Sequence, residues 1–123
     1  MDINKLTEKI LGFAFQVHSV LGPGLLESAY EECLFYELTK EGFSVSKQKE
    51  IPLVYKEIKL ERGYRADLVA DNKVVIEIKS IDAINDIHVA QMLTYLRLTK
   101  CQIGLLINFN VKSLKDVIRR FIL

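Results

Sequence analysis

The first forty residues carry a helical repeat of apolar positions. Between residues 4 and 21 apolar side chains recur every three or four positions, the spacing of one buried helix face. The turn Gly22-Pro23-Gly24 follows. A second helical pattern then runs from residue 25 to 41, with Gly42 placed to end it. The pattern predicts two helices before the first strand.

After this point the chain changes to alternating and β-branched residues. Residues 43–79 show no helical period and are interrupted at Pro52, Gly63 and Asp71-Asn72. This texture predicts an antiparallel meander of three or four strands.

The last third of the chain returns to a helix and then to strand. Residues 85–99 have apolar positions at helical spacing, with Asn85 as the expected N-cap, and 102–109 reads as a buried strand. Residues 113–123 carry signs of both a helix cap and a closing strand, and we favour the strand. We therefore expect an α/β fold with a mixed central β-sheet flanked by helices.

Composition agrees with one domain over residues 1–123. Half of the 123 residues are hydrophobic, which is enough for a real core. Seventeen basic and sixteen acidic side chains give a net charge of +1, so bulk charge does not indicate nucleic acid. Residues 1–39 hold two basic and six acidic groups (−4), whereas 40–123 hold fifteen and ten (+5). Residues 40–123 could present a positive face that fits nucleic acid. A surface on which basic and acidic side chains simply alternate explains the two charges equally well.

Two cysteines, Cys33 and Cys101, are too few for a disulfide framework and lack zinc spacing. We expect free thiols in a reducing compartment. No segment is apolar over a membrane-spanning length. These features predict a cytoplasmic protein with no membrane contact.

Charged residues interrupt two of the predicted strands. Asp67 lies within an apolar strand, and its neighbour carries Glu77 and Lys79 two positions apart, hence on one strand face. An isolated carboxylate in such a strand is costly to desolvate. One explanation is a solvent-exposed face of the hairpin. The other is a divalent cation held by Asp67 and Glu77, with the Lys79 ammonium stabilising developing negative charge.

The second explanation makes a prediction about strand register. A two-residue loop at Asp71-Asn72 would place Asp67 opposite Ile76, on the face away from Glu77. Convergence of the two carboxylates requires a bulge, or a three-residue loop that adds Lys73. We predict one of these.

Two helices supply further candidates. His88, Gln91 and Tyr95 share one face of the third helix, which is either its solvent side or a face toward the hairpin, where Gln91 could hold a water or Lys79. In the second helix Glu27 lies in the first turn, which suits the helix dipole or a third carboxylate of the site, and Tyr30 follows one turn later.

Four elements in order resemble a known superfamily. Asp67, Glu77-Ile78-Lys79 and Gln91-Met92-Leu93-Thr94-Tyr95 look like the D, ExK and QxxxY series of the PD-(D/E)XK nuclease superfamily in its RecB-like branch. Gly24-Leu25-Leu26-Glu27-Ser28-Ala29-Tyr30 is similar to the signature of its GxxExxY family. Ala66 stands where the proline of the name would precede Asp67. The resemblance covers nearly the whole chain.

This resemblance implies a restriction-endonuclease-like core and a metal site. Asp67, Glu77 and the Ile78 carbonyl would be the ligands, and Glu27 and His18 are further candidates. Lys79 would be the catalytic lysine, with Glu27 and Gln91 in the catalytic set. The supporting residues would be Tyr30, His88 and Tyr95.

The implied activity is Mg²⁺-dependent hydrolysis of phosphodiester bonds, with Mn²⁺ able to substitute and DNA favoured over RNA as the substrate. Two alternatives stay open: a binding module that retains the fold without cleaving, and an interaction domain whose charged strand face pairs in a homodimer. Because the charge is modest, a homodimer or a partner protein could supply grip on the substrate.

Overall fold

The computed structural model describes residues 1–60 and 63–123. Two helices, α1 (Ile3–Leu21) and α2 (Glu27–Lys40), precede the sheet, as the apolar repeat predicted. The α1 helix begins after Asp2, whose side chain accepts a hydrogen bond from the Asn4 amide at 3.3 Å. Between the helices the chain turns at Gly22, where φ is +68°.

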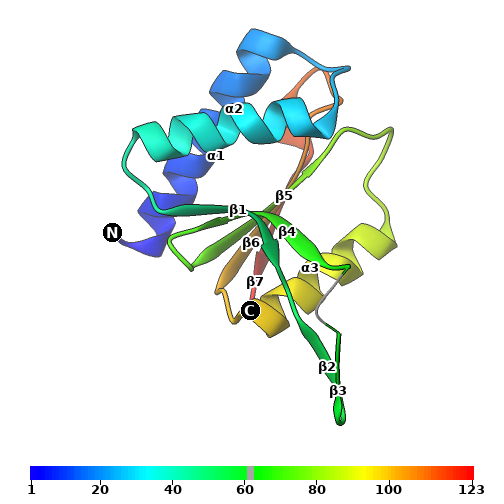
Figure 1. The fold of residues 1–123 in the computed structure, drawn as a ribbon. Helices are drawn as coiled ribbons and strands as arrows, with labels where there is room; N and C mark the ends of the chain where they lie inside the picture. Colours follow the sequence, from blue (N-terminus) through cyan, green and yellow to red (C-terminus); the bar gives the residue numbers. More distant parts are fainter. Residues whose placement is uncertain (61–62) are drawn as a thin grey trace.

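A five-stranded mixed sheet forms the centre of the molecule (Figure 1). Its order is β1-β4-β5-β6-β7, and every neighbouring pair is antiparallel except β5 and β6. The helix α3 (Asp86–Thr99) connects that parallel pair, because parallel neighbours need a crossover. The strands of this sheet are β1 (Val45–Glu50), β4 (Arg65–Ala70), β5 (Val74–Lys79), β6 (Ile103–Asn108) and β7 (Ile118–Ile122).

The meander contains more strands than the pattern predicted. Besides β1, β4 and β5 it includes a separate hairpin, β2 (Leu53–Tyr55) and β3 (Ile58–Leu60), which extends away from the sheet (Figure 1). Pro52 has no N–H for a ladder and separates β2 from β1. A tight turn with Lys56 at φ +52° joins the two short strands. We call this β2–β3 hairpin the arm.

Both ends of the third helix and the C-terminal strand follow the sequence prediction. Asn85 caps α3: its side chain accepts hydrogen bonds from the amides of Ile87 and His88. At the C-terminus both signals are realised, because the short 3₁₀ helix η1 (Leu114–Asp116) is followed by β7. The closing strand that we favoured therefore exists.

The two faces of the sheet carry separate apolar clusters. On one face α1 and α2 pack through Leu6, Leu34 and Leu38, among others, onto residues such as Ile76. On the other face Met92 and Leu96 of α3 pack against the sheet. None of the described helices is long and apolar enough to cross a bilayer.

The turn between β4 and β5 has the predicted length. Ala70 pairs with Val74 and Leu68 with Ile76, so the loop has three residues, Asp71, Asn72 and Lys73. Asp71 and Asn72 both have positive φ, 52° and 55°, a conformation that short polar side chains tolerate. This register places Asp67 level with Glu77.

Candidate active site

Asp67 and Glu77 meet where β4 and β5 stop pairing. The ladder between these strands ends at the pair of Leu68 and Ile76. Beyond it the Asp67 amide donates to Glu77 Oε2 at 2.7 Å, and the Ile78 amide donates to Asp67 Oδ2 at 2.8 Å. Each carboxylate thus accepts a backbone amide from the opposite strand, which fixes both side chains. We call this arrangement the carboxylate pair.

Glu77 is buried and Asp67 is half-buried, and burial dominates the electrostatics of the carboxylate pair. Glu77 is only 4% exposed, and burial followed by the neighbouring charge of Asp67 raises its pKa to about 8. Burial also raises the pKa of Asp67, against the opposing effect of its hydrogen bonds from Ile78 and Gln48. No ion pair among the described residues includes either carboxylate. Two adjacent carboxylates in this environment favour either a shared proton or a bound cation.

Lys79 and Glu27 lie close enough to act on the carboxylate pair electrostatically. The Lys79 charge lowers the pKa of both acids, and the Glu27 charge raises both. Glu27 is the first residue of α2, and its Oε2 accepts a hydrogen bond from the Ser80 amide at 3.1 Å. The structure therefore brings the start of α2 to the end of β5, beside Lys79.

Sequence reasoning missed a polar bridge on the other side of Asp67. The side-chain amide of Gln48 donates through Nε2 to Asp67 Oδ1 at 3.2 Å and to Glu31 Oε1 at 2.5 Å. The backbone of Gln48 has φ +52° inside β1, a conformation that is uncommon for residues other than glycine. Glu31 is 8% exposed and its pKa is raised, mainly by burial. No local sequence signal marks these residues, because Gln48 looks like any exposed strand position.

Tyr30 and His18 are tied to the surrounding backbone. Tyr30 is completely buried, stacks on Phe109 with ring centres 4.5 Å apart, and donates from its hydroxyl to the Gly22 carbonyl at 2.6 Å. The Leu25 amide donates to the same hydroxyl. Tyr30 therefore holds the turn that leads into Glu27. His18 Nε2 lies 2.7 Å from the Val111 carbonyl and must donate its proton there.

The three candidate residues of α3 have different surroundings. Tyr95 is 3% exposed; burial, then the charges of Glu77 and Asp67, raise its pKa. It lies in the buried cluster that also contains Ala66, the residue before Asp67 in β4. Gln91 and Tyr95 both line a groove beside α3. His88 accepts a hydrogen bond from the Asn85 amide through Nδ1 and completes the helix cap.

The carboxylate pair has the donor chemistry that Mg²⁺ prefers. This ion commonly takes one or two carboxylates and fills its remaining positions with water or phosphate oxygens. Among residues 1–60 and 63–123 no three His, Cys, Asp or Glu side chains gather as a metal site. A cation here would consequently depend on Asp67 and Glu77, with Glu27 farther out. The residues fit such an ion.

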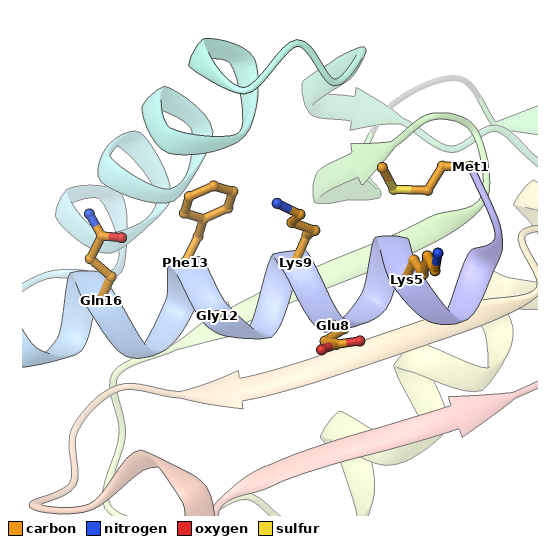
Figure 2. A pocket seen from close by; sticks show the side chains of 7 residues that line it. All are labelled: Met1, Lys5, Glu8, Lys9, Gly12, Phe13 and Gln16. Atoms are coloured by element: carbon orange, nitrogen blue, oxygen red, sulfur yellow. The ribbon is translucent and has the colours of Figure 1, made fainter.

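A larger hollow lies elsewhere and lacks this chemistry. A cavity of about 600 Å³ runs along α1 and includes Lys5, Glu8, Lys9 and Phe13 (Figure 2). Lys9 is already paired with Glu41 at 3.3 Å. None of the residues of the carboxylate pair lines this cavity. We therefore place the candidate active site at the start of β4 and the end of β5.

Comparison with known proteins agrees with this class of fold. A mixed sheet between helices, with Asp, Glu and Lys at the ends of two separating strands, is consistent with a PD-(D/E)XK nuclease fold. The family model of the PD-(D/E)XK nuclease superfamily matches residues 4–121. No curated protein matches the chain, and no solved structure does. The chain belongs to the PD-(D/E)XK nuclease superfamily. This membership indicates a nuclease with a nucleic-acid substrate.

Proposed function

We propose that the protein is a Mg²⁺-dependent nuclease that hydrolyses phosphodiester bonds, in DNA rather than RNA, and that it belongs to the GxxExxY family. The observation that carries the proposal is the carboxylate pair, with Glu77 buried and both side chains fixed by backbone amides beside Lys79. A pair of acids of this kind is costly without a cation or a proton. The choice of DNA and of the narrower family rests on the resemblance of the motifs.

Asp67, Glu77 and the Ile78 carbonyl would hold the metal, with Glu27 as a further candidate. His18 is left out of this set, because its Nε2 donates to the Val111 carbonyl. When bound, Mg²⁺ or Mn²⁺ would supply Lewis-acid polarisation of the phosphate and activation of water. The bonds from the Asp67 and Ile78 amides orient the carboxylates before any ion arrives, so little reorganisation is needed.

The remaining residues act directly on the substrate or on the geometry of the site. Lys79 would neutralise negative charge that develops on the phosphate. Glu27 holds the end of β5 through Ser80, and Gln91 would orient water or substrate from α3. Tyr95, with Tyr30 and His88 as supports, would keep these elements in place. A homodimer or partner protein would add grip on the nucleic acid, since the chain's net charge is only +1.

The test is cleavage of labelled single- and double-stranded DNA and RNA by the wild type and Glu77→Gln, with Mg²⁺, with Mn²⁺ and with chelator. We expect cleavage of DNA that needs the metal and falls at least about a hundredfold in the variant, because carboxylate-held metals contribute several kcal/mol. Glu8→Gln on the exposed side of α1 is the matched control and should cleave like the wild type.

A second candidate function, a binding module that retains the fold without cleaving, predicts a different result in the same assay. In that case no substrate is cleaved with either metal. Salt-dependent binding of nucleic acid would then persist in Asp67→Asn. Cleavage that survives in Glu77→Gln would contradict the proposed site itself.

A further inference from the structure

A second concave surface lies next to the carboxylate pair. It is a groove of about 310 Å³ between α3 and the chain that flanks the arm, in the size range of pockets for small organic groups. Leu53 lies at the start of the arm, and Tyr64 lies just before β4. From α3 come, among others, Gln91, Thr94, Tyr95 and Leu98. We call this surface the α3 groove.

The described residues that line the α3 groove are uncharged and partly aromatic. Among residues 1–60 and 63–123, those that line it include no Asp, Glu, Lys or Arg. Tyr64 is 45% exposed, so part of its side chain is open to a ligand. Gln91 offers an amide that can both donate and accept hydrogen bonds. A flat apolar group with polar edges suits such a lining better than a phosphate or a charged side chain does.

Tyr95 links the α3 groove to the candidate active site. It lines the groove and belongs to the same buried cluster as Ala66, the residue that precedes Asp67 in β4. At the groove's edge the Arg97 guanidinium donates to Thr94 Oγ1 at 3.0 Å. A cation therefore stands beside the uncharged lining. An aromatic slot with a nearby cation matches a nucleotide, whose base is flat and whose phosphate is negative.

We propose that the α3 groove holds one unstacked nucleobase of the strand that is cut, with its ring against Tyr64 and its edge toward Gln91. This inference rests on the proposed function and specifies its substrate class: single-stranded nucleic acid, or a duplex with an extruded nucleotide. Enzymes that need such a nucleotide hold the base between apolar or aromatic side chains and bind its edge. A base inside an intact duplex cannot enter the groove.

A protein could also cover this surface. Ile87 of α3 is 75% exposed, and the arm exposes Val54, Tyr55, Ile58 and Leu60, so a second copy of the chain is the main competitor. The link through Tyr95 to the candidate active site and the adjacent Arg97 favour the nucleotide. The experiment is therefore designed to separate the two occupants.

The experiment measures binding of short fluorescent oligonucleotides in chelator, where cleavage cannot occur. The probes are a single strand, its blunt duplex, and the single strand with one base removed at successive positions. Tyr64→Leu removes the ring, and Ala90→Phe fills the groove from an exposed position of α3. Tyr36→Leu is the matched control, since Tyr36 is 57% exposed on α2 and does not line the groove. Circular dichroism and thermal midpoints verify that each variant folds.

We expect the single strand to bind more tightly than the duplex and to lose about tenfold in affinity with Tyr64→Leu, the size of one stacked base. Ala90→Phe should cause a similar or larger loss, and Tyr36→Leu none. With the wild type, removal of the base that occupies the groove should cause the same loss of affinity as Tyr64→Leu. With Tyr64→Leu, removal of that base should cause no further loss.

Three results would overturn the inference. The first is that the single strand and the duplex bind with equal affinity, and that this affinity is the same in the wild type and in the groove variants. The second is that the groove variants lose the same factor of affinity for the duplex as for the single strand. The third is a dimer, seen by light scattering, that Ile87→Lys converts to monomers while oligonucleotide binding stays unchanged. Cleavage is measured separately. Binding that depends on Tyr64 without any cleavage would contradict the nuclease proposal alone. Cleavage that depends on Glu77 without an effect of Tyr64→Leu on binding would contradict the groove proposal alone.

Discussion

At the scale of single residues, the dominant feature is a pair of carboxylates that the fold holds side by side. Glu77 is nearly inaccessible, and it accepts a hydrogen bond from the backbone amide of Asp67 on the neighbouring strand. The backbone amides that hold the pair stabilise the charged form only in part, because burial still raises both pKa values. Like the strained backbone of Gln48, this is a cost to stability located at a candidate functional site.

This cost predicts how metal-free stability depends on pH. Because the pKa of Glu77 is raised from 4.5 to about 8 in the folded state, its protonation favours the fold fully below pH 4.5. That contribution is lost as the pH rises through about 8. Urea unfolding in chelator should therefore show stability falling across this window, and Glu77→Gln should be more stable than the wild type at its upper end.

The matched control is Glu8→Gln, an exposed acid with no such environment, which should follow the wild-type curve. A wild-type stability that stays flat from pH 4.5 to 8, or a Glu77→Gln variant that is less stable than the wild type above that window, would contradict the burial argument. The low-pH values of wild type and Glu77→Gln should agree, since both side chains are then uncharged.

At the scale of elements, the packing of α3 on β6 sets the position of Gln91 and Tyr95. Gly104 of β6 lies directly under this helix: a Cβ there would meet Met92 Sδ at 2.5 Å and Leu96 Cδ1 at 3.3 Å. Glycine is therefore required by close approach and not by a special backbone angle. The contact explains how α3 comes near enough to the sheet for Tyr95 to join the buried cluster that contains Ala66.

We expect Gly104→Ala to lower the free energy of unfolding by about 1–3 kcal/mol, the usual cost of inserting a methyl group into a packed core. Met92→Val shortens the side chain that would clash, so Gly104→Ala should cost less in that background, and urea unfolding of the four proteins gives the coupling. An equal cost in both backgrounds would show that Met92 is not the limiting contact.

Elements also show what sequence patterns could predict. The helices, the Asn85 cap, the buried strand and the closing strand follow from local spacing, because the period of apolar residues reflects which face is buried. The arm was not resolved by the pattern, since β2 and β3 have three residues each and their apolar side chains face outward. Too few positions exist there for a period to appear.

At the scale of the whole molecule, a bound cation should stabilise the fold through the carboxylate pair. A Mg²⁺ concentration about a hundred times the dissociation constant would add about 2.7 kcal/mol and raise the thermal midpoint. Because the ion must displace protons, the stabilisation should be large near pH 8 and above and should fade toward pH 4.5.

Thermal scans with Mg²⁺, Mn²⁺ and chelator test this expectation. The shift should disappear in Glu77→Gln and persist in Glu8→Gln. A midpoint shift of equal size in all three proteins would instead indicate a general ionic effect or another site. The measurement does not depend on knowing the substrate, so it reports on the metal alone.

The sequence by itself determined the helices, the strands of the main sheet and the candidates Asp67, Glu77 and Lys79, because charges in apolar strands and the two-residue period are local properties. It left a bulge and a three-residue loop open for the turn between β4 and β5, and the structure has the loop. Only the tertiary structure decided which distant residues join them. Gln48 and Glu31 reach Asp67 from another strand and a helix, and Tyr30 turns inward to hold the loop before Glu27. The physical reason is that such contacts depend on how helices pack on the sheet, and no short stretch of sequence records the depth or rotation of that packing.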